Sequence, residues 1–445
     1  MKHYHFVGIL GCGMRALVEI LLQRGEKVTG TDSNNASNAS FSKPIEISTD
    51  RSEHSKKCNY LIFSTAISQD HPDLQIAKRN HIPCLHRSEL IQKIIEEHTL
   101  NIAITGTHGK TTTSALVSFI FEQCDQKPTY AIGGSPTRFP QSQYSNDQTY
   151  FIFESDESDG SFLNTYPSHI LINNFESDHL EMHDDNFEQL QQTLIEYSQR
   201  AEIVFVCSDD SKAYAIAKKS KSVITYGFNP SDYQIISIQK NDKGMSLEGL
   251  YSKTNEKFKI KTSLHGDYNA TNIFGAVSIA HHFGISFKQI ATAIPNFEGV
   301  KRRMEKIGVT TINNYPVTVY DDYAHHPTEI SAISKMVDDR FENTILICQP
   351  HRNSRVKHHF NAYVESLSKI KNLILLTTYE PSSNQNEDYS KALFDTVSKT
   401  HDSIIYADES SIKQSLHKII NAPSVAVFIG AGSISQFAHN IVNYE

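Results

Sequence analysis

The chain lacks any run of about 18 consecutive apolar residues, the length that a membrane-spanning helix requires. Its first 22 residues have some apolar character, but Gly11, Gly13, Arg15 and Glu19 interrupt it. A secretory signal peptide has a cleaner apolar centre and small residues at a cleavage site. We therefore expect this stretch to be folded, and the protein to be cytoplasmic without membrane insertion.

Two further features are missing. The six cysteines are scattered and contain no C-x-x-C pair, which favours reduced thiols over a disulfide framework or a zinc site. Positive charge is not in excess, since 42 Lys and Arg residues face 50 Asp and Glu residues, for a formal net charge of −8. That balance argues against a protein that binds the phosphate backbone of nucleic acids.

What the chain does contain is enough apolar sequence for a core and three stretches in which strands alternate with helices. Hydrophobic residues make up 39% of 445 residues, and this length suggests two to four domains. Alternating strands and helices predict parallel sheets, so we expect an α/β protein with domains at 1–99, 100–298 and 299–445. The first and third are predicted to be Rossmann-like. The second is predicted to be a P-loop-type parallel sheet with a small antiparallel patch.

The predicted elements can be given by range. The first segment has strands at 5–9, 27–30 and 60–63, a helix at 15–23 and a polar loop at 34–42. The second has strands at 100–105, 150–153, 169–173 and 203–207, helices at 112–124, 186–200 and 269–283, and the antiparallel patch at 233–262. The third has strands at 317–320, 344–348, 372–376 and 425–429, and a helix at 327–337.

The strongest local signal is ITGTHGKTT, which follows a strand and opens a helix. Gly106 and Gly109 let backbone N–H groups approach a polyphosphate, and the helix N-terminus adds a positive end. Lys110 can neutralise β- and γ-phosphate charge, and the Thr111 hydroxyl can ligate Mg²⁺. The spacing is a compressed G-x-x-G-K-T-T form of the usual motif. The plain alternative is a chance Gly-Lys-Thr in a surface turn.

A second glycine loop, Gly11-x-Gly13-x-x-Ala16, also follows a strand, and Asp32 ends the next one. This pattern indicates a diphosphate on a helix N-terminus and a carboxylate near a ribose or base. NAD satisfies it, and so does a UDP-sugar. Glycines that serve only helix–strand packing are the structural alternative.

A third stretch, TYFIFESDESDGSFL, runs from a predicted buried strand into four carboxylates, Glu154, Asp156, Glu157 and Asp159. A solvated turn would explain it simply. Its place after the phosphate loop, at the carboxyl end of a strand, makes a metal site the alternative.

Together these motifs resemble those of the Mur ligases, three-domain ATP-dependent amide ligases of peptidoglycan precursor synthesis. The resemblance covers nearly the whole chain, in order: HFVGILGCGM, STAIS, ITGTHGKTTT, FESDESDGSFL, NNFESDH, GDYNATN, FEGVKRRMEKIG, DDYAHHPTEI, QPHRNSR and GAGSIS. It implies that the first domain binds a UDP-sugar, the second binds ATP, and the third closes over both and takes the amino acid.

The family reaction joins a carboxylate to an amine. ATP phosphorylates the carboxylate, the amine attacks the acyl phosphate, and ADP and phosphate are released. The first step brings two anions together, so Mg²⁺ and Lys110 are the expected stabilising charges. The resemblance implies that the site holds two metal ions, for which Mn²⁺ can substitute. It also implies that the protein is a monomer or a weak homodimer.

Family roles can be carried over residue by residue. The implied catalytic residues are Lys110, Glu154, His179 and His325, and the implied metal ligands are Thr111, Glu154 and His179. ATP is expected to contact Gly106, Thr107, His108, Gly109, Lys110, Thr111, Thr112, Asn269, Asn272, Arg303 and Asp322. The UDP-sugar is expected to contact Gly11, Gly13, Asp32, Ser64, Ala66, Ile67 and His108. The amino acid is expected to contact Tyr323, His325, Arg352 and Arg355.

A few details of the sequence indicate which branch of the family the chain resembles. Several sister ligases carry a modified lysine on the helix that matches NFEQLQQTLIEYSQR, which has none. This favours the branch that adds L-alanine to UDP-N-acetylmuramate, as do ESDESDGSFL and QPHRNSR. NNFESDH is nearer to the branch that attaches a recycled tripeptide. Tyr268 stands where the family usually has a histidine.

Two readings from other classes remain. An NAD-dependent oxidoreductase would use Gly11, Gly13 and Asp32 but would leave GTHGKTTT and the acidic stretch unexplained. A non-catalytic nucleotide-binding regulator would keep the fold, but the set Lys110, Glu154, His179 and Arg352 argues against it.

Overall fold

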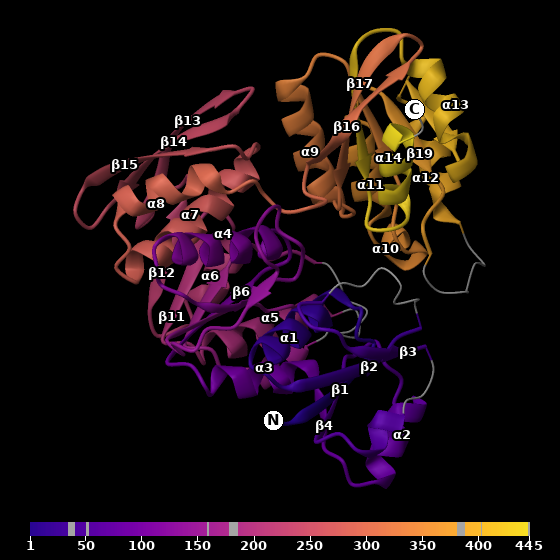
Figure 1. The fold of residues 1–445 in the computed structure, drawn as a ribbon. Helices are drawn as coiled ribbons and strands as arrows, with labels where there is room; N and C mark the ends of the chain where they lie inside the picture. The colour runs from indigo at the N-terminus through magenta and orange to yellow at the C-terminus, as the bar shows by residue number, and fades with distance from the viewer. Residues whose placement is uncertain are drawn as a thin grey trace. The chain divides into compact units, whose positions relative to one another are not determined.

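The computed structural model describes residues 1–33, 41–49, 53–157, 160–177, 186–380, 388–401 and 403–443 (Figure 1). Two compact units make up the chain. The first comprises Met1–Lys240, Gly244–Leu264 and Asn269–Glu298, and the second comprises Asn241–Lys243, His265–Tyr268 and Gly299–Glu445.

The first unit begins with a five-stranded parallel sheet in the order β3-β2-β1-β4-β5. Its elements are β1 (His3–Val7), α1 (Cys12–Gln23), β2 (Lys27–Thr31), β3 (Glu46–Ser48), β4 (Tyr60–Phe63), α2 (Pro72–Arg79), β5 (Cys84–His86) and α3 (Arg87–Ile95). Apolar residues of α1 and α3 pack on one face with Phe6 and Ile62. Those of α2 pack on the other face with Val7 and Leu61, so this sheet is covered on both sides.

The rest of the first unit is built on a ten-stranded sheet, β15-β14-β13-β12-β11-β10-β6-β9-β7-β8. Its strands are β6 (Leu100–Thr105), β7 (Thr129–Ala131), β8 (Ser142–Gln143), β9 (Tyr150–Glu154), β10 (His169–Ile172), β11 (Ile203–Cys207), β12 (Val223–Gly227), β13 (Tyr233–Asn241), β14 (Gly244–Tyr251) and β15 (Glu256–Thr262). Its helices are α4 (Lys110–Gln123), α5 (Phe187–Ser198), α6 (Ser211–Ala217), α7 (Asp267–His282) and α8 (Phe287–Ala293).

Strand β6 lies between β9 and β10 and runs parallel to both. The chain therefore leaves β6 at the point where the strand order reverses, which is where α/β sheets place their ligands. Hydrophobic residues of α5 and α6 share one core cluster with α1 and α3. This continuous core joins the two sheets of the first unit.

The second unit holds a six-stranded sheet in the order β16-β17-β21-β18-β19-β20. Its strands are β16 (Glu305–Ile312), β17 (Tyr315–Asp322), β18 (Thr344–Cys348), β19 (Leu373–Leu376), β20 (Ile404–Ala407) and β21 (Ser424–Ile429). Its helices are α9 (Pro327–Arg340), α10 (Asn353–His358), α11 (Phe360–Leu367), α12 (Tyr389–Val397), α13 (Ile412–Ile419) and α14 (Ile434–Asn443). One face packs against α9, α11 and α12, and the other packs against α13 and α14.

The predicted α/β fold class, with its three sheets and an antiparallel patch, is confirmed. The patch is β14 paired antiparallel with β15. Strands 60–63, 100–105, 203–207 and 344–348 have the predicted bounds. The domain limits at 99 and 299 remain predictions. Most of the polar loop predicted at 34–42 lies outside the described residues. No helix in the described ranges is both apolar enough and long enough to span a bilayer.

All six cysteines are free, and burial raises the pKa of every one of their thiols. The pKa is raised to about 11 at Cys58 and to about 12 at Cys207 and Cys348. The thiols of Cys12, Cys84 and Cys124 are raised by smaller amounts. Little thiolate is therefore present at neutral pH.

Candidate active site

The phosphate loop, Gly106–Gly109, joins β6 to α4 and needs its glycines. Both have positive φ, 123° at Gly106 and 81° at Gly109, a region that L side chains rarely adopt. A Cβ on Gly106 would lie 2.9 Å from the Asn174 carbonyl, and one on Gly109 would lie 2.6 Å from Asn272 Oδ1. The loop is therefore packed against the end of β10 and the start of α7, and its shape suits a bound polyphosphate.

Lys110, the first residue of α4, is folded back over this loop. Its Nζ donates to the Gly106 carbonyl at 2.8 Å and to Glu157 Oε2 at 3.1 Å, and it lies 3.7 Å from Asp156 Oδ1. Burial alone would lower the pKa of this ammonium, but Glu157, Asp156 and Glu154 together raise it above its ordinary value. Lys110 is thus a fixed positive charge at any physiological pH.

Glu154 is the last residue of β9, and it lies where the sequence predicts a metal ligand. Its Oε2 accepts from the Gly133 backbone N–H at 3.0 Å, and the Thr111 side chain lies near enough to the same carboxylate to lower its pKa. Burial raises the pKa of Glu154, against the opposing influence of Lys110 and Thr111. The structure therefore places Thr111 and Glu154 near each other, and their shared role as metal ligands stays a prediction.

The other acids of this stretch have different surroundings. Glu157 is buried and pairs with Lys110, and burial raises the pKa of its carboxyl group. Asp156 is more exposed, and its carboxylate lies farther from the Lys110 ammonium than that of Glu157. The sequence did not rank these two acids, because their distance from Lys110 depends on how β9 ends. Asp159 lies outside the described residues, and so does His179, one of the proposed metal ligands.

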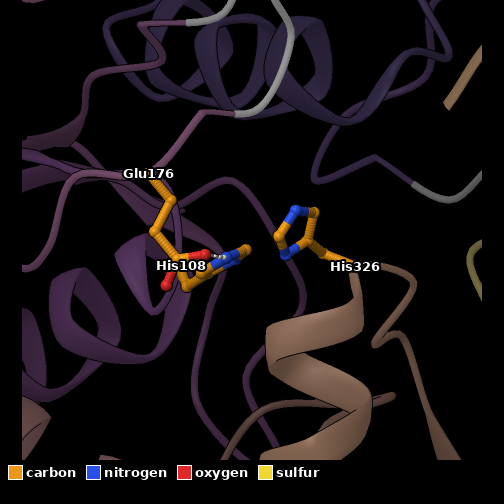
Figure 2. A group of neighbouring side chains, drawn as sticks. All are labelled: His108, Glu176 and His326. Atoms are coloured by element: carbon orange, nitrogen blue, oxygen red, sulfur yellow. Dashed lines mark ion pairs between the residues drawn. The ribbon is translucent and has the colours of Figure 1, made fainter. Parts of the chain in front are cut away.

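His108 links the loop to the turn after β10 (Figure 2). Its backbone N–H donates to Asn174 Oδ1 at 2.7 Å, and its Nε2 lies 3.7 Å from Glu176 Oε2. The amide groups of Asn173 and Asn174 both donate to the His108 carbonyl. The motif NNFESDH by itself indicates no role for these two asparagines. Their role in holding the loop is a tertiary contact between two strand ends.

The predicted adenine side also meets the loop. Asn272 lies in the first turns of α7 and is buried, and its Nδ2 donates to Asn269 Oδ1 at 3.3 Å. Thr112 is buried in α4, and Thr107 Oγ1 accepts from the Glu176 N–H at 2.9 Å. The predicted ATP residues of the first unit thus surround one loop.

The predicted UDP-sugar residues gather at the carboxyl edge of the first sheet. Asp32 Oδ2 accepts from the Leu10 N–H at 2.8 Å, which ties the glycine loop to the end of β2. Ser64, Ala66 and Ile67 form the turn after β4, closed by Ile67 N–H to the Ser64 carbonyl at 3.0 Å. Gly11 is the N-cap residue of α1 and offers no side chain to cap it. No side-chain hydrogen bond from this position therefore occupies the first backbone N–H groups of the helix.

Both glycine-loop domains share one pocket of about 190 Å³. Cys12, Gly13, Arg87, Gly133, Glu154 and Asp156 are among its lining residues. The Cys12 thiol hydrogen-bonds to the Gly133 carbonyl, and Gln141 Nε2 donates to the Cys12 carbonyl at 3.2 Å. One carboxylate, Glu154, therefore faces both the phosphate loop and the pocket of the UDP-sugar loop.

In the second unit, Asp322 ends β17 and is buried. Its two oxygens accept from the backbone N–H groups of Met304 and Ala324, each at 2.8 Å. Burial raises its pKa to about 6, although Arg303 opposes this. The Arg303 guanidinium lies 5.4 Å from the centre of the Tyr323 ring.

His325 has a defined orientation beside Tyr323. Its Nδ1–H donates to the Tyr323 carbonyl at 3.0 Å, and the two rings pack edge to face at 5.3 Å. This bond fixes the tautomer and makes Nε2 the basic nitrogen of the neutral ring. His326, the third residue drawn in Figure 2, belongs to the second unit, where its side chain caps α9.

Arg352 and Arg355 follow β18, at the carboxyl end of the sheet. Arg352 has φ 64° and ψ 123°, a conformation that an L side chain rarely adopts. It is held there because its N–H donates to the Tyr379 carbonyl and Tyr379 N–H donates to the Pro350 carbonyl, both at 2.8 Å. Arg355 is buried. The backbone strain at Arg352 coincides with the predicted amino-acid pocket.

Sequence models of one protein family match almost the whole chain. They are described as "Mur ligase family, catalytic domain" at residues 3–99, "Mur ligase middle domain" at residues 104–280 and "Mur ligase, glutamate ligase domain" at residues 302–432.

Curated relatives extend over the same length. A UDP-N-acetylmuramate–L-alanine ligase of Buchnera aphidicola is 32% identical over 99% of this chain and 94% of its own. The protein of that name from Hydrogenovibrio crunogenus is 31% identical over 99% and 98%.

Solved structures share the fold at lower identity. The UDP-N-acetylmuramate–alanine ligase of Thermotoga maritima superposes with a TM-score of 0.83 at 22% identity, over 100% of this chain and 99% of its own. A murein peptide ligase of Psychrobacter arcticus has a TM-score of 0.72 at 20% identity, over the same shares. A MurF ligase of Thermotoga maritima, solved in complex with ADP, has a TM-score of 0.63 at 14% identity, over 87% and 95%.

Proposed function

The chain belongs to the Mur ligase family, and we propose that it joins L-alanine to the lactyl carboxylate of UDP-N-acetylmuramate. ATP is cleaved to ADP and phosphate, and the sugar carboxylate passes through an acyl phosphate. The single observation that carries this proposal is the position of Glu154. It lies near Thr111, in the first turn of α4, and lines the pocket that Gly13 of the other glycine loop also lines.

The described residues fit a Mg²⁺ ion. Thr111 and Glu154 offer a hydroxyl and a carboxylate, the hard oxygen ligands that Mg²⁺ prefers, and the two side chains lie near each other. When bound, the ion supplies positive charge to the phosphates and to the carboxylate that attacks them. We propose Glu154 and Thr111 as ligands of one ion and His179 as a ligand of a second, with Mn²⁺ as a substitute.

The chain's own groups then divide the work. Lys110 and the loop amides offset the charge of the transferred phosphate. Arg352 and Arg355 bind the alanine carboxylate, since a guanidinium can donate to both of its oxygens. His325, with Nδ1–H held by the Tyr323 carbonyl, accepts a proton from the alanine ammonium through Nε2. The remaining proposed contacts to ATP and the UDP-sugar are those predicted from the sequence.

An amine-varied ADP-release assay tests the proposal. Purified protein is given ATP, Mg²⁺ and UDP-N-acetylmuramate, and only the amine is changed. We expect the highest kcat/KM with L-alanine. A higher value with the peptidoglycan tripeptide would assign the protein to the recycling branch instead. ATP binding without amide formation from any amine would identify a regulator, and saturable NADH binding would revive the oxidoreductase.

We also propose that the protein acts in the cytoplasm as a monomer or weak homodimer, on small-molecule substrates alone. Sedimentation at several protein concentrations would detect a tight oligomer, which would contradict this.

A further inference from the structure

Two adjacent arginines precede β16, and the sequence assigned a role only to the second, Arg303. The first, Arg302, has a φ of 57°, in the left-handed region that L side chains rarely adopt. Two hydrogen bonds of its backbone hold it there. The Arg302 N–H donates to Glu305 Oε2 at 2.9 Å, and the Arg302 carbonyl accepts from the Tyr323 N–H at 2.8 Å. The turn before β16 is therefore tied directly to Tyr323, one of the predicted amino-acid contacts.

The Arg302 side chain contacts three different groups of the second unit. Its Nε lies 3.3 Å from Asp321 Oδ2, and its Nη2 donates to the Gly430 carbonyl at 2.7 Å. Asp321 belongs to β17 and Gly430 follows β21, and these two strands are parallel neighbours. The guanidinium carbon lies 4.8 Å from the centre of the Tyr323 ring, within the range of a cation–π interaction. Arg302 thus links the ends of two strands to an aromatic side chain.

The ion pair with Asp321 fixes the guanidinium in place, because this acid is buried. The exposed fraction is 0% for the Asp321 side chain and 29% for that of Arg302. Ser435 Oγ also donates to Asp321 Oδ2. Burial raises the pKa of this carboxyl group, and the Ser435 hydrogen bond and the Arg302 charge oppose that change. Movement of the guanidinium would leave a buried carboxylate with less compensation, which is costly.

One side of the predicted amino-acid pocket depends on Tyr323. Its ring contacts the Arg302 guanidinium and packs edge to face against the His325 ring at 5.3 Å. Its carbonyl holds the Nδ1–H of His325. The Tyr323 side chain is 37% exposed, so much of its ring has no protein neighbour to restrain it. Because Arg302 contacts both the backbone N–H and the ring of Tyr323, it sets the position of Tyr323 and, through it, of His325.

The other side of the pocket is reached through Gly430. The turn that begins at Gly430 packs against Tyr379, since a Cβ on Gly432 would lie 2.4 Å from Tyr379 Cγ. The Tyr379 carbonyl in turn accepts from the Arg352 N–H and holds that residue in its strained conformation. A displacement of the Gly430 carbonyl would therefore reach the residue that positions Arg352.

We propose, resting on the function proposed above, that Arg302 is a positioning residue of the amino-acid pocket. It joins the side that carries Tyr323 and His325 to the side that carries Arg352. Its own nitrogens are engaged by a carboxylate and a carbonyl of the protein, so its effect on the substrate is exerted through these neighbours. L-alanine offers few atoms for binding, and its reaction therefore depends on how closely these few groups are placed.

Steady-state kinetics with each substrate varied separately provides the test. Arg302→Ala should raise KM for L-alanine by about tenfold or more and leave KM for UDP-N-acetylmuramate unchanged. The sugar nucleotide is the reference because its predicted contacts lie in the first unit. Arg302→Lys keeps a charge beside Asp321 but loses the planar fork that also reaches the Gly430 carbonyl. It should melt close to wild type and show a smaller rise in KM for L-alanine.

A double variant separates positioning from stability. Arg302→Ala leaves the buried Asp321 carboxylate without this cation and should lower the melting temperature. Addition of Asp321→Asn removes the charge and should restore most of the melting temperature, while KM for L-alanine stays high. If KM recovers together with the melting temperature, Arg302 has a structural role alone and the proposal is overturned.

Arg200→Ala is a matched control. Arg200 also donates to backbone carbonyls, those of Leu163 and Thr165, and its guanidinium lies 4.5 Å from the centre of the Tyr166 ring. It belongs to the first unit, where no amino-acid contact is predicted. This variant should lower the melting temperature and leave KM for L-alanine unchanged. An equal rise in KM would show a general effect of lost stability and overturn the proposal.

An unchanged KM for L-alanine in Arg302→Ala would overturn it as well. If Arg302→Ala does not fold, Arg302→Lys gives the same readout. If the tripeptide proves the better amine for wild type, the same comparison is made with the tripeptide. Failure of the proposed ligase function would appear separately, as a wild-type protein that releases no ADP with any amine, and it would overturn both proposals.

Discussion

Nζ of Lys110 and Oε2 of Glu157 are 3.1 Å apart and form an ion pair whose side chains are only 13% and 4% exposed. The two charges are removed from water together, at the base of the phosphate loop. Loss of one partner leaves the other buried without compensation, which is costly.

The first prediction follows from this pair. Lys110→Ala should abolish ADP release and lower the melting temperature, because Glu157 loses its cation. The double variant Lys110→Ala/Glu157→Gln should recover most of the lost stability, on the order of 3 kcal/mol, without recovering activity. Thermal denaturation and the ADP assay measure the two effects. If both variants are unfolded, the loop lysine is structural and the assignment is wrong.

Gly133→Ala should inactivate the enzyme through Glu154. A Cβ at this position would lie 2.3 Å from Glu154 Oε2, so the carboxylate must shift from its present position. We expect kcat to fall at least about a hundredfold and the Mg²⁺ concentration for half-maximal activity to rise. Gly284→Ala is the control, since it also adds a methyl group at a glycine but at a helix end with open space around it. It should lower stability and keep kcat.

Substitutions at Arg352 test two points, the role of its side chain in the amino-acid pocket and the strain of its backbone. Arg352→Ala should raise KM for L-alanine by about tenfold or more while Kd for ATP is unchanged. Arg352→Gly loses the same guanidinium but relaxes the backbone at φ 64°, so it should be more stable than the alanine variant by about 1 kcal/mol. An unchanged KM in either variant would exclude Arg352 from the pocket.

The pH dependence of folding should depend in part on His169. Burial lowers its pKa from 6.5 to about 4, and His282 adds to this. Below pH 6.5, His169 is protonated in the unfolded chain but stays neutral in the folded chain. The contribution of the neutral histidine to the free energy of unfolding is therefore lost as pH falls toward 4. Between pH 7 and 4.5, the free energy of unfolding of His169→Phe should fall by about 2 kcal/mol less than that of wild type. Equal losses, measured by urea unfolding, would contradict the assignment.

The sequence predicts strands that are short buried runs with clear flanks, such as β6 and β11, but it does not identify β3, β5, β7, β8, β12, β16 or β20. The family resemblance also implies that Thr111 and Glu154 hold one metal ion, and the structure places the two near each other because α4 follows β6, which is paired in parallel with β9. The short helix α10 is different. It begins at Asn353 after a strained Arg352 that only the Tyr379 backbone explains, and no local pattern encodes that contact.

Arg87 shows a second limit of sequence reasoning. Its sequence neighbours, His86 and Ser88, look like an ordinary helix start. Its Nη1 lies 2.7 Å from the position that a Cβ on Gly13 would occupy, and this approach depends on the packing of two helices that are more than 60 residues apart in the chain. Likewise, the ion pair of Glu157 depends on where β9 ends, so composition alone could not separate it from Asp156.

The six thiols with raised pKa values have a practical consequence for spectroscopy. Maleimide dyes react with thiolates, and all six native cysteines are poorly ionised near pH 7. A cysteine introduced on an exposed face of each unit would therefore label in preference to the buried Cys58, Cys207 and Cys348, and Cys12, which is exposed, would first be replaced by serine. A donor and an acceptor dye attached in this way would report the distance between the two units as substrates are added, without a cysteine-free background.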